Sequence, residues 1–483
     1  MRELGEVVTI SEPVDPDEEM GALTYLIART EGLPAIVFTN PESPHTEMRN
    51  DLGMSHLWNP IGGSWRRLAL MFDLDPALTR LEIVHELKSM FGRLIPPVEV
   101  PIAEAPVLQN RIDADAVNLM ALPFPRHWSK DGGRYAGTHD VVFSANSDGL
   151  VNVGTHRMML LGPREASIMI SPGTDTWANM TASWERGEPH PIAAAWGVHP
   201  LLVAVGGSNV PAHISEYDYL GGLIGEPVQV VRSPSSGLVF PAAAEFVIEG
   251  HIRPNHFKEE GPFGEFTAHY RDKTELYPVV TVEAVWHRSD PVMTNALLGF
   301  PPSNEEQTTE AALRAARIWQ QLDSLGVRGV TGVYCPPTAA CGWAMTIVSL
   351  RQQFPGHSQQ VLQLAGNVPA GAHFTKWIVV VDDDVDPTDL EQVVWAMATR
   401  CPPSERILIQ NRTWNNTLDP AMDPGSTRVV GSRAFIDATR DFEHGDHFSR
   451  TLLTKPMYEK VAARWASLNI PAPIPKVDLF DRR

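Results

Sequence analysis

The stretch DVVFSANSDGLVNVGTHRMMLLGPREASIMI, residues 140–170, sets the expectation for the fold. Short apolar runs alternate in it with Gly, Pro, Asp and Asn, which is the pattern of β-strands separated by turns. The same pattern continues through the middle of the chain, with further strand-like runs at 200–205, 228–232, 245–249 and 278–286. Helical patterns are sparse in this region, and 177–187 is the best candidate. Many short strands with turn signals predict a β-barrel or a β-sandwich.

On both sides of this β-rich region the pattern changes to mixed helix and strand. Residues 17–29 and 75–87 carry apolar side chains at helical spacing, and the apolar run 35–38 between them predicts a strand. After the middle region, the sequence predicts a long helix at 308–325, a buried strand at 374–383, and then a capped helix from Asp386 to about residue 399.

We therefore predict a mixed α/β and β fold with four segments. These are an N-terminal α/β domain (1–104), a β-rich domain (105–305), a C-terminal α/β domain (306–454), and a terminal helix with a tail (455–483). The run 455–468 is amphipathic, so its apolar stripe needs a surface to cover it. A second subunit and the chain's own core are the two candidates for that surface.

Composition narrows the class of protein. The chain has 483 residues with 39 Lys and Arg against 58 Asp and Glu, a formal net charge of −19, which disfavours nucleic acids and anionic membranes as partners. The three cysteines, Cys335, Cys341 and Cys401, have no CxxC spacing, so neither a disulfide scaffold nor a cysteine zinc site is expected. The first residues have no apolar signal core, and no apolar run approaches the roughly 20 residues of a membrane span. These features predict a soluble, cytoplasmic protein.

Residues 152–157, Asn-Val-Gly-Thr-His-Arg, place an amide, an imidazole and a guanidinium close together. On a regular strand, Asn152 and Arg157 would point to opposite faces. They converge only if the chain bulges or turns at Gly154. A solvent-facing loop with an arginine ion pair is the alternative.

Two further segments carry carboxylates. In 214–219, Glu216 sits among aromatic residues, where burial would raise its pKa unless a cation compensates; an exposed loop glutamate is the alternative. In 259–267, a Gly-Pro-Phe-Gly turn separates Glu260 from Glu265 and is able to bring both to one site. Two carboxylates that share a site have separated pKa values, so one holds a proton near neutral pH, as a general acid must. A charged hairpin is the alternative there.

Several common catalytic patterns are missing from the sequence. It contains no GxxxxGK[ST] phosphate loop, no HExxH zinc motif and no GxSxG nucleophile motif, and no GxGxxG follows a strand. The acidic run 382–384 looks like a metal site, but its position between a strand and a helix predicts a solvated capping turn. His190 and His199 flank a strand-like run and are expected to be structural.

Six motifs, in order along the chain, give it a resemblance to the UbiD family of decarboxylases, which use prenylated FMN. The motifs are NVGTHR (152–157), SEY (215–217), EGHIRP followed by EEGPFGEFT (249–267), LGFPPSNEE (298–306), KWIVVVDDDVDP (376–387) and IDATRDF (436–442). The resemblance covers nearly the whole chain. It implies an N-terminal α/β domain, a central split β-barrel related to flavin-binding barrels, and a C-terminal α/β domain whose terminal helix reaches across a dimer.

The resemblance also implies roles for particular residues. Carried over by motif, the catalytic trio is Glu260, Arg157 and Glu265, with Glu265 as the proton donor and Arg157 in contact with the cofactor and the substrate carboxylate. The implied cofactor-binding residues are Asn152, Val153, Gly154, Thr155, His156, Arg157, Glu216 and, at the cofactor phosphate, Lys376.

A metal site is implied in the same way. The family holds the cofactor phosphate through a divalent metal, usually Mn²⁺, with K⁺ nearby, and the metal ligands are an asparagine, a histidine and a glutamate. Asn152 and Glu216 match two of these ligands. The histidine is missing after the Ser-Pro-Gly turn at 171–173, and Asp175 is the nearest candidate, with an oxygen ligand that suits Mn²⁺ or Mg²⁺.

The predicted function is reversible, non-oxidative decarboxylation of an aromatic, heteroaromatic or α,β-unsaturated carboxylic acid. The cofactor is needed because side chains alone do not delocalise the charge left when CO₂ departs. The expected partners are the acid and CO₂, a flavin prenyltransferase that supplies the cofactor, and further copies of the chain in a homodimer or higher oligomer. A flavin-binding accessory protein without decarboxylase activity and a metal-dependent hydrolase are the alternatives. The segments 298–301 and 412–416 are expected to line the substrate pocket.

Overall fold

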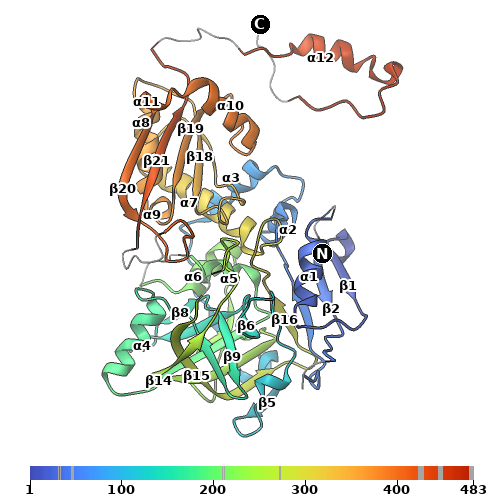
Figure 1. Cartoon of the computed structure of the whole chain (residues 1–483), viewed down its shortest axis with the longest axis vertical. Helices are drawn as coiled ribbons and strands as arrows, with labels where there is room; N and C mark the ends of the chain where they lie inside the picture. Colours follow the sequence, from blue (N-terminus) through green and yellow to red (C-terminus); the bar gives the residue numbers. More distant parts are fainter. Residues whose placement is uncertain are drawn as a thin grey trace.

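The computed structural model describes residues 1–30, 32, 34–44, 48–208, 210, 213–270, 273–422, 429–443 and 450–477. Helices and strands alternate at both ends of the chain, and antiparallel strands dominate the middle. Figure 1 shows the C-terminal sheet at one end of the molecule, the central curled sheet at the other, and the N-terminal elements along one side. The predicted mixed α/β class is confirmed, while the predicted domain boundaries stay predictions.

The N-terminal sheet is completed by a strand from the middle of the chain. Its order is β1-β2-β3-β16, and β16 pairs in parallel with β3. The strands are β1 (Val7–Ile10), β2 (Ala35–Phe38), β3 (Ser55–Trp58) and β16 (Val292–Asn295), and the helices are α1 (Glu19–Ile27), α2 (Trp65–Met71) and α3 (Arg80–Met90). Helix α3 begins at Arg80 and not at Asp75 as predicted, because Thr79 and Glu82 form a capping box that fixes its first turn.

The central sheet is antiparallel and runs in the order β6-β9-β10-β15-β14-β11-β7-β8, with β5 beside β15. Its strands are β5 (Asn110–Asp113), β6 (Tyr135–Gly137), β7 (Val141–Ala145), β8 (Val151–Gly154), β9 (Met158–Gly162), β10 (Glu165–Ile168), β11 (His190–Trp196), β14 (Phe246–Glu260) and β15 (Glu275–His287). The sheet curls into a half-barrel that is open between β6 and β8 (Figure 1). The more specific split-barrel description stays a prediction.

One predicted strand of this region is a helix. Residues 200–205 lie in α5 (Pro200–Gly206), where proline fits the first turn and the side chain of His199 accepts a hydrogen bond from Leu201 N at 3.3 Å. A short buried apolar run has the same composition whether it forms a strand or a helix. Only its capping residues, here His199 and Pro200, indicate the helix. The remaining elements here are α4 (Asp175–Glu185), α6 (Glu216–Ile224) and a small sheet of β4 (Val98–Glu99), β12 (Gln229–Arg232) and β13 (Val239–Pro241).

The C-terminal sheet has the order β17-β18-β19-β21-β20. Its strands are β17 (Val330–Tyr334), β18 (Met345–Leu350), β19 (Trp377–Asp382), β20 (Ile407–Trp414) and β21 (Val430–Ala438), and its helices are α7 (Glu306–Ser324), α8 (His357–Asn367), α9 (Pro369–Ala372), α10 (Leu390–Arg400) and α11 (Pro403–Arg406). The long helix, buried strand and capped helix predicted here correspond to α7, β19 and α10, but Asp389 and not Asp386 is the N-cap of α10. Single 3₁₀ turns occur at Arg2–Leu4, Ile102–Glu104, Pro106–Leu108, Leu119–Ala121 and Trp465–Leu468.

One apolar core joins the three parts of the molecule. Buried residues of α3, α5 and α7, such as Val84, Leu201 and Ile318, belong to the same packed cluster. Helix α3 lies along α7, and Lys88 pairs with Asp323 at 2.8 Å across that contact. The long helix α7 is therefore held in place by both neighbouring regions.

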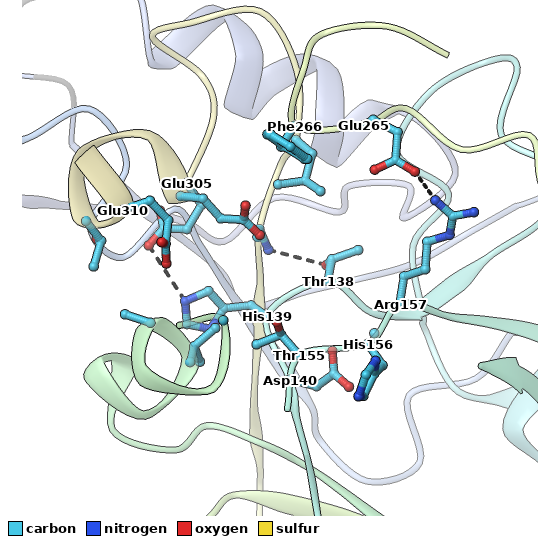
Figure 2. Close-up of a pocket in the computed structure, with 18 of the residues that line it drawn as sticks. Thr138, His139, Asp140, Thr155, His156, Arg157, Glu265, Phe266, Glu305 and Glu310 are labelled. Carbon is cyan, nitrogen blue, oxygen red and sulfur yellow. Dashed lines mark hydrogen bonds and ion pairs between the residues drawn. The ribbon is translucent and has the colours of Figure 1, made fainter. Parts of the chain in front are cut away.

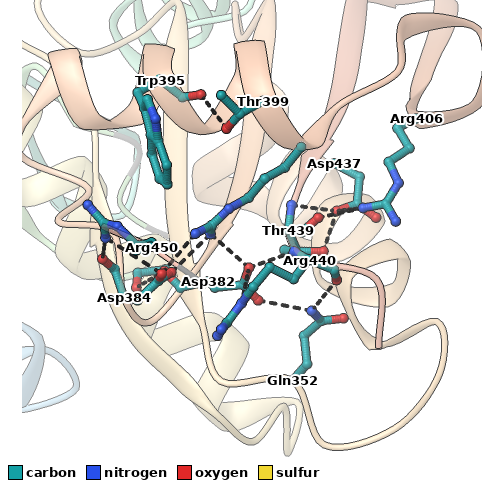
Figure 3. Close-up of polar contacts among 12 residues, drawn as sticks. Gln352, Asp382, Asp384, Trp395, Thr399, Arg406, Asp437, Thr439, Arg440 and Arg450 are labelled. Atoms are coloured by element: carbon teal, nitrogen blue, oxygen red, sulfur yellow. Dashed lines mark hydrogen bonds and ion pairs between the residues drawn. The ribbon is translucent and has the colours of Figure 1, made fainter. Parts of the chain in front are cut away.

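The acidic turn after β19 is solvated at Asp383, as predicted, but not at Asp382. Asp382 is 3 % exposed, and Arg400 donates to Asp382 at 3.0 Å and to Asp384 at 2.8 Å (Figure 3). Arg440 and Arg450 also pair with these carboxylates. The prediction was wrong for Asp382 because the compensating arginines come from distant parts of the chain, which spacing does not reveal.

The terminal segment forms helix α12 (Lys455–Ala462), and none of its residues is buried. The helix lies away from the C-terminal sheet in Figure 1. Met457 and Val461 are 45 % and 36 % exposed, so the chain's own core does not cover the predicted apolar stripe.

Candidate active site

Arg157 lies in the turn between β8, which ends at Gly154, and β9, which begins at Met158. The chain therefore turns after Gly154, but of Asn152 and Arg157 only Arg157 lines the cavity described below. A side chain at Gly154 has no room, because a Cβ atom there would lie 2.7 Å from His156 Nε2. Glu260 is the last residue of β14, and Glu265 follows the turn after it.

Arg157 contacts both glutamates at once. Its Nε and Nη2 atoms donate to Oε1 and Oε2 of Glu260, each at 3.0 Å, and its Nη1 atom donates to Glu265 Oε1. The hydroxyl of Tyr135 donates to Glu260 Oε1 at 2.6 Å. The structure thus brings the three predicted catalytic residues into direct contact, with a bidentate pair that fixes the guanidinium plane.

These charges are buried and paired. Glu260 is 1 % exposed, and the side chain of Arg157 is 10 % exposed. Burial acts to lower the pKa of Arg157, but Glu265 and Glu260 outweigh it, and the pKa ends above its ordinary value. Burial, followed by Glu260, raises the pKa of Tyr135, so this hydroxyl stays a hydrogen-bond donor. Arg157 is therefore a permanent cation with a fixed orientation.

Asp131 holds the turn that separates the two glutamates. Its Oδ1 atom accepts from Gly264 N at 3.1 Å, and its Oδ2 atom accepts from Trp128 N at 2.9 Å. Burial raises the pKa of Asp131 to about 6, although its backbone donors oppose the shift. Gly132 N donates to Pro262 O at 2.8 Å beside it. The position of Glu265 thus depends on a buried carboxyl that the sequence did not mark.

A cavity of about 350 Å³ opens beside this cluster. Arg157 and Glu265 line one side of it, while Glu305 and Glu310 line another, with His139 and Asp140 between them (Figure 2). Leu298 and Asn416 also line the cavity, so each segment expected to form the pocket contributes to it, whereas Phe300 and Trp414 of the same segments are 68 % and 56 % exposed.

Several buried polar atoms that line this cavity have no partner. Among the described residues, His139 Nδ1, Asp140 Oδ2 and Thr309 Oγ1 form no hydrogen bond. Burial raises the pKa of Asp140 to about 8. Buried polar groups in native proteins are almost always satisfied, so these three atoms call for a bound polar ligand or ordered water. A flavin ring, with both donors and acceptors on its edge, fits the requirement of His139 and Asp140.

The three predicted metal ligands lie near one another but outside the cavity lining. Glu216, the first residue of α6, accepts from Val153 N at 2.8 Å, and Asn152 donates to Thr176 at 2.9 Å. Burial raises the pKa of Glu216 to about 7, with Asp175 adding to the effect of burial and the hydrogen bond from Val153 N opposing it. Two neighbouring carboxylates and an amide form an oxygen-rich donor set that suits a hard divalent cation. Among the described residues no three His, Cys, Asp or Glu side chains form a metal-binding group, so this set stays a prediction.

The other predicted cofactor residues divide into two groups. Thr155 and His156 line the cavity, and the His156 ring contacts Met169 O and Thr176 Oγ1, each at 3.0 Å. Burial lowers the pKa of His156 to about 4, so its ring is neutral. Lys376 instead lines a separate pocket and pairs with Asp419 at 2.5 Å. Its predicted contact with a phosphate would require breaking that ion pair.

Sequence reasoning missed several residues of the site. Tyr135 and Asp131 stand in no chemical motif, and their roles appear only when β6 lies against the 260–265 turn. Thr309 and Glu310 lie a few residues after the LGFPPSNEE motif, at the start of the predicted long helix. That position next to the motif is the one sequence signal that could have indicated them.

Family models match consecutive parts of the chain. Residues 1–87 match the 3-octaprenyl-4-hydroxybenzoate carboxy-lyase N-terminal domain, 98–301 match the Rift-related domain of the same family, and 307–438 match its C-terminal domain. Together these matches account for most of the chain.

Solved structures agree with the family match. The closed form of vanillic acid decarboxylase from Sedimentibacter hydroxybenzoicus is 27 % identical, with a TM-score of 0.81 over 97 % of both chains. The UbiD-class enzyme HmfF from Pelotomaculum thermopropionicum in complex with FMN is 26 % identical, with a TM-score of 0.82 over 95 % of this chain and 96 % of that one. An evolved dimeric form of HmfF with prFMN has a TM-score of 0.79 at the same identity and coverage.

Proposed function

This chain belongs to the UbiD family and is a carboxy-lyase, and from that premise we propose that it decarboxylates an aromatic, heteroaromatic or α,β-unsaturated acid reversibly with prenylated FMN. The contact of Arg157 with both Glu260 and Glu265 at the cavity wall carries the proposal. The flavin-bound relatives support the choice of cofactor.

When bound, the cofactor supplies an electron sink for the charge left by CO₂. The predicted cofactor residues that line the cavity, Thr155 and His156, would contact it together with the unpartnered His139 and Asp140. The set Asn152, Asp175 and Glu216 would hold a Mn²⁺ or Mg²⁺ ion for its phosphate, with K⁺ nearby, and Lys376 would contact the phosphate after release from Asp419.

The residues of the chain then perform the remaining steps. Arg157 binds the substrate carboxylate, and Glu260 with Tyr135 fixes the guanidinium so that the carboxylate has one orientation. Phe263 and Leu298 give the cavity apolar wall, which favours loss of the carboxylate as neutral CO₂. Glu265 delivers a proton to the carbon that CO₂ has left.

The decisive experiment compares the native chain with Glu265→Gln after co-expression with a flavin prenyltransferase. Mass spectrometry of the released cofactor should find prenylated FMN in both proteins. CO₂ release from a panel of aromatic and unsaturated acids should fall roughly 10²- to 10⁴-fold in Glu265→Gln, because general acid catalysis is worth that much. Glu259→Gln, at the exposed neighbour of Glu260, is the matched control. Normal turnover by Glu265→Gln would remove it as the proton donor.

The carboxy-lyase assignment takes precedence over the accessory-protein and hydrolase alternatives. The hydrolase alternative requires bound metal but no flavin. Active protein in which mass spectrometry finds no flavin would support that alternative. An accessory protein would retain flavin and turn over no acid in the panel. Within the described residues no helix is long and apolar enough to cross a bilayer. A cytoplasmic location stays a prediction.

We also propose a homodimer or a larger homo-oligomer. The edge strand β20 presents Leu408, Ile409 and Trp414, each more than half exposed, and α12 adds an uncovered apolar stripe. Exposed apolar side chains on an edge strand and on a terminal helix are typical of an interface. Light scattering of the purified protein tests it, and a monomer at micromolar concentration would contradict it.

A further inference from the structure

The first turns of α7 place three polar side chains on the cavity wall. Glu306, Thr309 and Glu310 are three and four residues apart, so they share one face of the helix, and all three line the cavity. Glu305 differs from them, because its carboxylate accepts from Ile61 N at 2.8 Å and Gly62 N at 2.6 Å.

None of the three has a partner for its side chain within the described part of the chain. Neither Glu306 nor Glu310 forms an ion pair or a side-chain hydrogen bond, and Thr309, which is 4 % exposed, leaves Oγ1 unpaired. Burial raises the pKa of Glu306 to about 7, with Glu265 and Glu305 adding to it, and burial raises that of Glu310 to about 8, with Glu306 adding to it. Each carboxyl offers a hydrogen-bond acceptor whether or not it is protonated, and no Lys or Arg side chain of the described lining residues lies on this wall.

The opposite side of the cavity has the reverse character. Arg157 is the only Lys or Arg among the described lining residues, and Figure 2 shows it with Glu265 across the cavity from Glu310. A substrate carboxylate is attracted to Arg157, whereas the α7 wall offers it no cation among the described lining residues. The far end of the substrate consequently meets the α7 wall.

We propose that Glu306, Thr309 and Glu310 select an acid that carries a nitrogen donor, an amino group or a ring N–H, at the end away from its carboxylate. This inference rests on the proposed function and adds a substrate class to it. A hydroxyl group donates one hydrogen, whereas an amino group donates at least two from one atom and satisfies two acceptors of this wall. An apolar substituent would leave the polar atoms of all three side chains without a hydrogen-bond partner. Enzymes discriminate strongly against a substrate that leaves buried polar groups unpaired.

The test measures binding and turnover separately. The probes are benzoate, 4-hydroxybenzoate, 3-aminobenzoate, 4-aminobenzoate and 4-(aminomethyl)benzoate. Calorimetry with Glu265→Gln holoenzyme gives equilibrium affinities without turnover, and CO₂ release by the native holoenzyme gives activity. At least one amino-substituted acid should bind at least about tenfold more tightly than benzoate and more tightly than 4-hydroxybenzoate.

Isosteric variants connect this preference to the α7 wall. Glu306→Gln and Glu310→Gln, added to Glu265→Gln, should each reduce the preference several-fold, and Thr309→Val should reduce it less. Asp323→Asn, on the exposed part of the same helix, should leave it unchanged. Melting curves establish that each variant is folded, and the Glu-to-Gln changes keep the side-chain volume.

Benzoate binding as tightly as every amino-substituted acid would overturn the inference, as would a preference that survives both Glu-to-Gln changes together. Loss of the preference when K⁺ or Mg²⁺ is added would assign the wall to an inorganic cation and would also overturn it. Absence of CO₂ release from every acid in the wider panel, despite a binding preference for amines, would contradict the proposed function alone.

Discussion

Two buried clusters of arginine and carboxylate lie in this chain, and they differ in which charge is in excess. At the cavity, one arginine, Arg157, serves two glutamates. At the end of β19, three arginines serve Asp382 and Asp384 (Figure 3). The second cluster also closes its own loops, since Arg440 N donates to Asp382 at 2.6 Å.

The sign of the excess charge distinguishes the functional cluster from the structural one. Burial acts to raise the pKa of Asp384, but Arg400 outweighs it and holds the pKa low, so this carboxylate is a fixed anion. The cavity cluster keeps a carboxylate excess and a side open to a ligand. An excess of arginine fixes structure, whereas an excess of carboxylate beside a cavity leaves a group available for proton transfer.

The largest expected effect comes from Arg157→Ala. It removes the cation shared by Glu260 and Glu265 and the group that orients the substrate, so turnover should fall about 10³-fold or more. The unpaired Glu260 should also lower the melting temperature, because leaving a buried charge alone is costly. CO₂ release and thermal unfolding measure the two effects. Turnover within tenfold of the native value would mean that the cavity cluster is structural, like the cluster at the end of β19.

Arg400→Ala should separate structure from function. It leaves Asp382 and Asp384 with less compensation, and we expect a loss of about 3 kcal/mol in the free energy of unfolding. Turnover per folded molecule should stay near the native value at a temperature where the variant is folded. Arg351→Ala, whose side chain is 70 % exposed, is the matched control and should change stability little. A large fall in turnover would show that the β19 cluster reaches the active site.

Tyr135→Phe tests one contact within the cavity cluster. It removes the 2.6 Å hydrogen bond to Glu260, which should cost roughly 2 kcal/mol of stability because the acceptor is charged. Turnover should also fall, since Glu260 loses one of the contacts that hold it against Arg157. Unchanged stability and unchanged turnover would mean that Tyr135 contributes packing alone.

Glu310→Gln should have the smallest effect, and one of opposite sign. The pKa of Glu310 in the folded protein is about 8 against an ordinary 4.5, with Glu306 adding to the effect of burial and Arg317 and Arg314 opposing it. Below about pH 4.5 this group does not oppose folding, and stability falls as the pH rises toward 8. Glu310→Gln removes that fall, so at pH 8 its melting temperature should exceed the native one by about 2–4 °C. A gain that is equal at pH 5 and pH 8 would contradict this account.

Local signals explain why part of the molecule was predictable from its sequence. The Gly-Pro-Phe-Gly turn carried enough turn chemistry to predict that Glu260 and Glu265 are able to share a site, and the resemblance to the UbiD family added Arg157 to them. Strands and helices with clear periodicity, such as those containing 35–38, 308–325 and 374–383, were also predictable.

The rest depends on contacts between residues far apart in the chain. Asp382 meets Arg440 only after β21 has been placed beside β19, so the acidic turn had no local sign of its partners. Residues 200–205 have the composition of a buried strand, but they form α5 and pack in the core that they share with several other helices. Glu310 is polar within an amphipathic helix, which ordinarily predicts a solvent-facing position, and only the cavity makes it interior.

The pairing of β16 with β3 has a consequence for biosynthesis. When the ribosome has made β3, the strand that will cover its free edge is still more than two hundred residues from synthesis. At roughly 5–20 residues per second, that edge waits on the order of tens of seconds. An unpaired edge invites wrong pairing with other chains. Translation speed between these two strands, and chaperones that bind nascent chains, should therefore govern how much active protein a cell obtains.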